Sequence, residues 1–348
     1  HDEPTWTGSS VLRDTYLVKE ISRGTYGTVF LANHHCRRTN TESKVAVKVC
    51  VASKFETMLH PIEMMVAAEM DACPHTVSML DHFYSPWHNV LVLELLDLDL
   101  YSAIRRHYLQ ALDVETSAHT MCCVAKGVAW MHKKGYAHRD LHFGNILLKV
   151  ETEARLAAKV TIQREMIEQV KVADFGQALD TRDPSLGPKH DAQISPLVIM
   201  PPEILFRKGT KNVGGNIGWQ PSTCAYTIAV DVWAIGVLFL GCIASPKNFL
   251  GGSTTASELA KHMVALLGLL PSQVVREHGW QPPGIYISSW RAAQSYSAPR
   301  SAGSQAKRTK SRLSPCIATA LRTALHNVAA QHTLQNSSTR CCISWSIG

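Results

Sequence analysis

The chain has 348 residues, of which 45% are hydrophobic and 18% charged, and this balance excludes a disordered chain. The net charge of +7 is unevenly distributed, because all 28 Asp and Glu residues lie within the first 277 positions, together with 27 of the 35 Lys and Arg residues. The body of the protein is therefore close to neutral, and the end of the chain is basic. A nucleic-acid partner for the body is accordingly not expected.

Ten cysteines are too few for a disulfide scaffold, and none lies in a Cys-x-x-Cys pair that would indicate a structural zinc site. The longest apolar run, residues 232–244, is 13 residues long, which suits a buried helix and is too short for a membrane span. No signal peptide is recognisable, so we expect a protein of the cytoplasm or the nucleus with reduced thiols and no membrane association. Since the chain starts at His1, the natural N-terminus is expected upstream.

The first part of the chain predicts a small β-rich unit. Runs of β-branched and aromatic residues, bounded by turn residues, indicate five strands at 16–21, 28–32, 44–51, 77–83 and 90–95. Between the third and fourth of these, residues 55–72 are rich in Met, Ala and Glu and indicate a helix that ends before Pro74.

After Asp97 the pattern becomes mainly helical. Apolar residues at helical spacing predict helices at 98–108, 114–134, 230–242 and 259–270, and two short strands are expected at 146–150 and 170–173. Residues 151–168 are charged and Ala-rich and predict an exposed helical insertion, and a second insertion is expected at about 207–225. From residue 286 a basic, Ser- and Ala-rich tail is expected to be poorly ordered.

A glycine-containing segment, residues 21–29 with the sequence Ile-Ser-Arg-Gly-Thr-Tyr-Gly-Thr-Val, stands between the first two expected strands. Glycine lets the backbone approach phosphate groups closely and donate N–H groups to them. A Gly-x-x-Gly turn by itself more often closes a simple hairpin, so this segment gains meaning only from the motifs that follow it.

A lysine, Lys48, ends the apolar run Val-Ala-Val in the third expected strand. A central strand seldom contains a lysine that lacks a partner. Either the side chain reaches outward from an edge, or its ammonium is held over a triphosphate by a carboxylate of the next helix. Glu63 is the first choice for that carboxylate, and Glu69 and Glu56 are alternatives.

Two further segments carry carboxylate and amide side chains. Residues 138–145 read His-Arg-Asp-Leu-His-Phe-Gly-Asn, in which Asp140 is suited to act as a base and Asn145 as a metal ligand. Asp174, followed by Phe and Gly, comes directly after a short apolar strand. Magnesium takes few, hard oxygen ligands in addition to substrate phosphates, so Asn145 and Asp174 are the candidate magnesium ligands.

These motifs occur in one order along the chain and are followed by Pro-Pro-Glu at 201–203 and by Asp-Val-Trp-Ala-Ile-Gly at 231–236. The set resembles the signature of the eukaryotic protein kinase family, over roughly residues 14–270. The resemblance implies an α+β, bilobal protein-kinase fold with a small β-rich N-lobe at 14–96 and a larger, mainly helical C-lobe at 97–285. The helices that usually close this C-lobe are not recognisable after residue 285, so an atypical or truncated C-terminal end, with the tail at 286–348, is expected.

The resemblance implies an ATP- and Mg²⁺-dependent enzyme that transfers the γ-phosphate to Ser or Thr hydroxyls of protein substrates. It assigns catalytic roles to Asp140, which would accept the hydroxyl proton, and to Lys48, His142 and Asn145. It assigns the nucleotide-binding roles to Ile21, Ser22, Gly24, Gly27, Val29, Ala46, Lys48, Glu63, Glu94, Leu96, Leu147 and Asp174. In this assignment residues 94–96 form the hinge that holds adenine by backbone hydrogen bonds, and Leu93 is the gatekeeper.

Within that family, the glycine segment and the Asp-Leu pair after the hinge look most similar to the cyclin-dependent and mitogen-activated kinase branch. The helix that carries Glu63 does not resemble a cyclin-binding helix, so a cyclin-type activator is not expected. Met200 stands where that branch usually has an arginine, so a requirement for proline in the substrate is not expected either.

Three departures leave other functions open. Ser22 replaces the first glycine of the loop, His142 stands where Ser/Thr kinases usually have a lysine that meets the γ-phosphate, and Pro196 lies near the position of a threonine that contacts the catalytic aspartate. One alternative is therefore a catalytically weak pseudokinase or incomplete kinase that acts as a binding module. Another is a small-molecule phosphotransferase, because residues 140–145 also resemble the catalytic loops of such enzymes.

His142 has two possible roles. If it replaces the lysine, its useful form is the imidazolium, and turnover is expected to fall as the pH rises through the neutral range. Alternatively, the imidazole only packs or hydrogen-bonds with the loop backbone. The sequence leaves both roles open.

Overall fold

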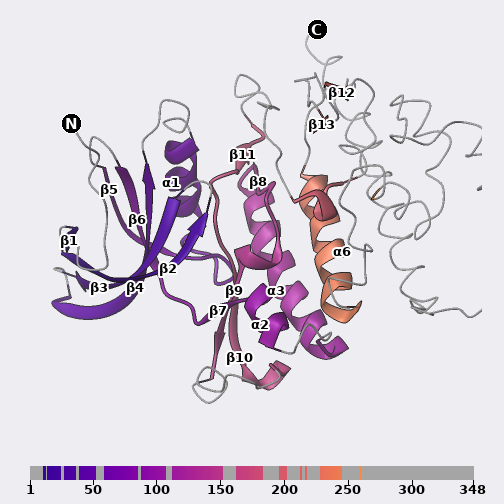
Figure 1. Cartoon of the computed structure of the whole chain (residues 1–348), viewed down its shortest axis with the longest axis horizontal. Coiled ribbons are helices and arrows are strands. Elements are labelled where there is room, and N and C mark those ends of the chain that lie inside the picture. Colours follow the sequence, from indigo (N-terminus) through magenta and orange to yellow (C-terminus); the bar gives the residue numbers. More distant parts are fainter. Residues whose placement is uncertain are drawn as a thin grey trace, which may run out of the picture. The chain divides into compact units, whose positions relative to one another are not determined.

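The computed structural model describes residues 11–12, 14–24, 27–36, 39–51, 59–84, 88–106, 112–151, 162–182, 196–201, 212–213, 216–217, 228–244 and 259 (Figure 1). The chain divides into two units, the first comprising His1–Lys189 with Cys224–Asp231 and the second the remaining residues. The tail at 286–348, the glutamate at 203 and almost all of the helix expected at 259–270 lie outside the described residues.

An antiparallel sheet with the strand order β1-β2-β3-β4-β6-β5 forms the N-terminal part of the first unit (Figure 1). Its strands are β1 (Val11–Leu12), β2 (Thr15–Gly24), β3 (Gly27–Cys36), β4 (Thr41–Val51), β5 (Met79–Tyr84) and β6 (His88–Glu94). The five strands expected from the sequence are confirmed, and most are longer than expected. The two-residue β1 was not foreseen, because so short a segment carries no period of its own.

Alternation along these strands places one set of apolar side chains on a shared, buried face. The buried cluster consists of Leu17, Phe30, Ala32, Val45, Val47, Val49, Phe83, Val90 and Val92. Helix α1 (Leu59–Met70) contacts β5 and buries Val66, Ala67 and Met70. Because Lys48 lies between the buried residues Val47 and Val49, its side chain belongs to the alternate set of β4 positions.

The second part of the first unit is built on α2 (Leu100–Arg106) and α3 (Val114–Lys133). Asp113 caps α3 by accepting a hydrogen bond from the Thr116 backbone N–H at 2.8 Å. Two small sheets complete this part: one has the order β10-β9-β7, from β10 (Ile167–Val172), β9 (Ile146–Val150) and β7 (Leu98–Asp99), and the other pairs β11 (Leu179–Asp180) with β8 (Tyr136–Ala137).

Two sequence expectations are wrong in detail. The helix predicted from residue 98 begins at Leu100, because Leu98 and Asp99 pair with β9 as a strand. The segment 151–168 is not an exposed insertion throughout: Arg164–Met166 form a short 3-10 helix, β10 begins at Ile167, and Ile162 and Ile167 are buried. The helical expectation for 152–161 lies outside the described residues.

In the second unit the structure describes the 3-10 turn η5 (Leu197–Ile199), the short hairpin of β12 (Asn212–Val213) and β13 (Asn216–Ile217), and most of α6. Helix α6 (Ala229–Ala244) begins in the first unit and confirms the expected buried helix. Among the described residues, the helices are too short or too polar to cross a membrane.

Candidate functional site

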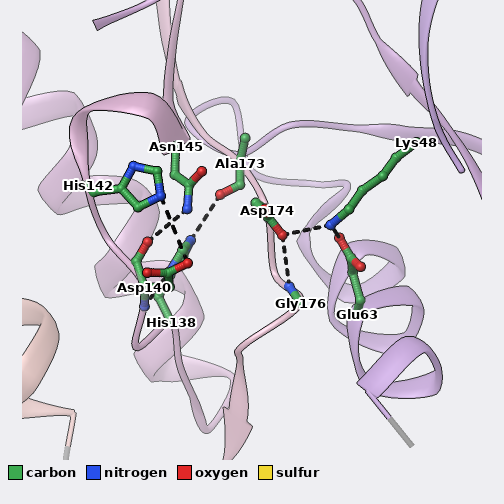
Figure 2. A network of polar contacts seen from close by, with 9 residues as sticks. All are labelled: Lys48, Glu63, His138, Asp140, His142, Asn145, Ala173, Asp174 and Gly176. Atoms are coloured by element: carbon green, nitrogen blue, oxygen red, sulfur yellow. Dashed lines mark hydrogen bonds and ion pairs between the residues drawn. The ribbon is translucent and has the colours of Figure 1, made fainter. Parts of the chain in front are cut away.

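Lys48 forms the centre of a buried ion-pair network. Its Nζ lies 2.6 Å from Glu63 Oε1 on α1 and 2.8 Å from Asp174 Oδ1, which follows β10 (Figure 2). This geometry selects Glu63 as the partner predicted from the sequence. Of the alternatives, Glu69 accepts a hydrogen bond from the Tyr136 hydroxyl, and Glu56 lies outside the described residues.

The charges of this network support one another. Burial alone would lower the pKa of Lys48, but the carboxylates of Glu63 and Asp174 raise it well above its ordinary value. Burial likewise opposes ionisation of Asp174, yet the charge and hydrogen bond of Lys48 hold the pKa of Asp174 below its ordinary value. Burial raises the pKa of Glu63, with the Lys48 ammonium opposing the rise. A charged lysine is therefore fixed at the position predicted to meet a nucleotide's phosphates.

The first residues of the segment 138–145 are held by one buried carboxylate, that of Asp231 in the first turn of α6. Its Oδ1 accepts from the Arg139 backbone N–H at 2.8 Å, and its Oδ2 accepts from the His138 backbone N–H at 2.8 Å. The His132 ring nitrogen Nε2 also lies 2.8 Å from Oδ2. These bonds hold Arg139 at a φ of 71°, a left-handed conformation that a residue with a Cβ seldom adopts. The structure thus makes Asp231 a structural anchor of this segment.

Asp231→Ala is expected to lower the free energy of unfolding by about 3 kcal/mol, since it leaves two buried backbone donors without an acceptor. Turnover is expected to fall as well, because the same bonds fix the backbone of the two residues directly before Asp140. Chemical denaturation and steady-state kinetics measure the two effects. Asp231→Asn keeps one acceptor oxygen and is expected to lose less; an alanine variant as stable as wild type would contradict the anchoring role.

Asp140 lies in this anchored loop and carries an unusual carboxyl group. Burial and the neighbouring charge of Asp174 raise the pKa of Asp140 to about 7. A carboxylate with a pKa near neutrality is well matched to accept a proton at physiological pH. Asn145 supports the loop by donating its side-chain N–H to the Asp140 carbonyl oxygen at 2.8 Å.

The magnesium ligands predicted from the sequence fit the chemistry of that ion. Because the amide nitrogen of Asn145 donates to the loop, its side-chain oxygen is the atom suited to ligate a cation, and Asp174 adds a carboxylate. Figure 2 shows Asp174 between Lys48 on one side and Asp140 with Asn145 on the other. Within the described part of the chain, three or more His, Cys, Asp or Glu side chains do not gather into a metal cluster.

The structure bears on the two roles that the sequence left open for His142. Its Nδ1 accepts a hydrogen bond from the Gly144 backbone N–H at 3.0 Å, and its Nε2 lies 3.9 Å from Asp140 Oδ2. Burial, together with the charge of His138, lowers the pKa of His142. Both observations favour the neutral imidazole, and the hydrogen bond with the loop backbone is the alternative that the sequence had left open.

Most of the other predicted nucleotide residues lie on neighbouring strands of the N-terminal sheet. Ala46 and Leu93 are register partners on β4 and β6, and Val29 is the register partner of Lys48 on β3. Gly24 pairs with Gly27 at the end of the β2–β3 hairpin, where a Cβ on Gly27 would come within 2.5 Å of the Val49 carbonyl oxygen. Ile21 and Ser22 lie on β2 and are exposed, while Leu147 lies on β9.

Sequence reasoning missed the partner of Glu94. Lys171 on β10 places its Nζ 2.5 Å from Glu94 Oε1, and the same oxygen accepts from the Ser78 backbone N–H at 2.7 Å. The Glu94 side chain is thereby occupied, so it is the backbone of the segment 94–96 that can meet a ligand. A signal was available, because Lys171 lies between two valines in a strand, as Lys48 does.

The chain belongs to the protein kinase domain family, which matches residues 16–283. It is 28% identical over 298 residues to "Cyclin-dependent kinase D-1" of Oryza sativa subsp. indica, covering 84% of this chain and 59% of that protein. It is 29% identical over 227 residues to "Serine/threonine-protein kinase KIN28" of Saccharomyces cerevisiae, covering 64% of this chain and 60% of that protein. "Sporulation protein kinase mde3" of Schizosaccharomyces pombe is 29% identical over 252 residues, which cover 70% of this chain and 40% of the relative.

These findings confirm the family and the α+β kinase fold, with a β-rich N-lobe followed by helices of the C-lobe. They also confirm a divergent position near the cyclin-dependent branch, since the named relatives share under a third of their residues with this chain. The matched segment spans about 59% of the length of the rice relative, so activity and partners of the whole relatives do not transfer directly.

Proposed function

We propose that this chain is an ATP- and Mg²⁺-dependent protein kinase that transfers the γ-phosphate to Ser or Thr hydroxyls. The observation that carries the proposal is the buried Lys48 with its two carboxylates at 2.6 and 2.8 Å, one of which belongs to Asp174 beside the Asp140 loop. Such an assembly costs desolvation energy and is therefore unusual in a fold that does not use it. Relatives named as serine/threonine and cyclin-dependent kinases support the acceptor class.

Each residue has a task that follows from its surroundings. Lys48 would contact the α- and β-phosphates as a permanently charged donor, because its pKa is raised. Asp140 would receive the proton of the attacking hydroxyl, since its own pKa of about 7 lets it exchange a proton near neutrality. Asn145 and Asp174 would hold Mg²⁺, which when bound supplies neutralisation of phosphate charge. Most of the catalysis is then positioning and electrostatics.

One observation favours a second candidate, a pseudokinase with weak or absent transfer. The residue at the expected γ-phosphate lysine is His142, and its pKa is lowered by burial, so a full positive charge is missing there at neutral pH. The lysine, both carboxylates and Asp140 are nevertheless all in place, which supports an active enzyme. The small-molecule alternative has less support, because the named relatives are protein kinases.

The cyclin question concerns α1. Relatives carry the name cyclin-dependent kinase, and in this chain α1 places Glu63 Oε1 at 2.6 Å from Lys48 Nζ. We therefore propose that a cyclin-type activator is not needed to form the ion pair. Activity of the isolated chain supports this part of the proposal, and strict dependence on an added activator would argue against it.

Two measurements test the proposed function. Calorimetric titration with ATP, with and without Mg²⁺, is expected to show binding that Mg²⁺ strengthens. Incorporation of labelled phosphate from ATP is then compared between a generic Ser/Thr-containing protein and a panel of small alcohols. Label in the protein supports the kinase, label in an alcohol supports a small-molecule enzyme, and Mg²⁺-ATP binding without transfer to either identifies a pseudokinase.

A further inference from the structure

The two ring nitrogens of His142 have different environments. Nδ1 accepts the hydrogen bond from the Gly144 backbone N–H at 3.0 Å, as the cap of the short helix η2 (Phe143–Asn145). A nitrogen that accepts a hydrogen bond carries no proton, so the proton of the neutral ring resides on Nε2. The backbone therefore fixes one tautomer, in which Nε2–H is a donor.

Gly144 is shaped to permit this bond. A Cβ at residue 144 would come within 3.0 Å of His142 Cε1 and 3.1 Å of His142 Nδ1, closer than most real Cβ contacts. A larger residue would therefore push the imidazole away from its cap position. The Gly144 backbone and the His142 ring form one fitted unit.

The free donor faces the catalytic base. Nε2 lies 3.9 Å from Asp140 Oδ2, and both side chains are partly exposed, at 32% for His142 and 20% for Asp140. This separation is too long for a direct hydrogen bond. The separation suits two groups that contact two neighbouring oxygens: Asp140 would accept from the hydroxyl, and His142 would donate to an oxygen of the phosphoryl group. Figure 2 shows the His142 ring beside Asp140 and Asn145.

We propose that His142 is a neutral catalytic donor, whose Nε2–H hydrogen-bonds with an oxygen of the transferring phosphoryl group. The inference rests on the proposed function and deepens it by replacing the expected cation with a tautomer fixed by the backbone. In the step, the acceptor hydroxyl oxygen forms a bond to the γ-phosphorus, and the bond from that phosphorus to the β,γ-bridging oxygen breaks with its electron pair leaving on ADP. The hydroxyl proton passes to Asp140, and His142 keeps its proton throughout.

Two isosteric substitutions separate the two nitrogens. In His142→Asn, the amide oxygen can reproduce the Nδ1 acceptor, but no donor remains at the Nε2 position. In His142→Gln, the longer amide can reproduce the Nε2 donor, but the cap is lost. We expect His142→Asn to lower kcat by about 100-fold, the scale of a lost transition-state donor, with an unchanged ATP dissociation constant and melting temperature. We expect His142→Gln to keep kcat within about 10-fold of wild type, with a lower melting temperature.

A higher kcat for His142→Asn than for His142→Gln would overturn the proposal. If His142 serves only as a backbone cap, His142→Asn has wild-type kcat and His142→Gln is the impaired variant. Gly144→Ala provides an independent arm: by displacing the ring it is expected to lower kcat, and to lower it no further when combined with His142→Asn. Fully additive losses would contradict the link between Gly144 and the donor.

The failure of this inference is distinguishable from the failure of the proposed function. Wild-type chain is assayed first with Mg²⁺-ATP and a generic protein substrate. Absence of transfer by the wild type, with nucleotide binding retained, refutes the proposed function and with it the role of His142. Robust wild-type transfer together with a fully active His142→Asn leaves the kinase proposal standing and removes His142 from the catalytic residues.

Discussion

Asp140→Asn is expected to lower the rate of phosphoryl transfer by about 10² to 10⁴-fold, the scale of a lost general base. The ATP affinity is expected to stay close to that of wild type. Asp140 accepts a hydrogen bond from Asn145 through its carbonyl oxygen, and Lys48 forms an ion pair with Asp174. In the proposed function Asp140 would meet the hydroxyl, whereas Lys48 and Asp174 would bind the nucleotide. Single-turnover kinetics and calorimetric ATP titration measure the two quantities. Equal losses of binding and of turnover would show that Asp140 belongs to the nucleotide site instead.

The same substitution is expected to stabilise the folded chain at alkaline pH. Burial and Asp174 raise the pKa of Asp140 from its ordinary value to about 7, so the folded protein holds this proton more tightly than the unfolded chain. The contribution of Asp140 to the free energy of unfolding therefore falls as the pH rises toward 7. Above that pH the full energetic cost of burying the ionised carboxylate is present. Asparagine removes the cost, so the gain in melting temperature is expected to be largest near pH 8 and to shrink toward pH 4.

A matched control is available at the N-cap of α3. Asp113→Asn also removes one carboxylate, but hydrogen bonds from Thr116 lower the pKa of Asp113, which is the opposite direction. The charge of Asp113 therefore stabilises the fold above its pKa, and its removal is expected to cost stability at neutral pH and less in acid. The same pH trend in both variants would indicate a general charge effect and contradict the account of Asp140.

The raised pKa of Asp140 also determines the acid limb of the wild-type pH profile. kcat/KM for Mg²⁺-ATP reports groups of the nucleotide-free enzyme, so it is expected to rise with pH through about 7 as Asp140 loses its proton. A fall with rising pH, as the sequence alone suggested for a His142 imidazolium, is not expected, because the pKa of His142 is lowered.

The sequence predicted the N-terminal sheet and the central ion pair well, for a physical reason. The strands alternate or run apolar over five residues or more, and a lysine in such a strand needs a counter-charge, which leaves few candidates on the next helix. Residue type and position paired Lys48 with a glutamate of the next helix, with Glu63 as the first choice. The geometry then decided between Glu63 and Glu69.

Features that depend on contacts distant in sequence were not predictable. The start of β10 was misjudged because Ile167 stands next to charged residues, and its pairing with Val150 of β9 is a contact that the sequence does not reveal. The left-handed φ of Asp174, 64°, and that of Arg139 have no sequence signal, since both residues carry a Cβ. The tautomer of His142 depends on a single backbone N–H two residues away, which residue type alone does not reveal.

Lys48→Met is expected to remove transfer, weaken ATP binding and destabilise the fold, all from one side chain. The ammonium is the shared counter-charge of Glu63 and Asp174, at 2.6 and 2.8 Å, and the Lys48 and Glu63 side chains are only 9% and 5% exposed. Breaking a buried pair by removing one partner typically costs about 3 to 5 kcal/mol, because the remaining charge is left uncompensated. Lys44→Met on the same strand, where the lysine is exposed, is the control and is expected to change none of the three quantities.

The double variant Lys48→Met/Glu63→Met separates stability from function. Two methionines fill the space of the pair and remove the charge of Glu63, so that only Asp174, whose side chain is 36% exposed, is left without the ammonium. Part of the lost stability is therefore expected to return, whereas transfer stays absent. The stability deficit of the single variant is also expected to shrink in acid: without Lys48, burial raises the pKa of Glu63 further, and protonation then removes the uncompensated charge. Chemical denaturation near pH 5 and pH 8 measures this difference. Unchanged turnover in Lys48→Met, or a double variant no more stable than the single one, would contradict the central place of this ion pair in the site.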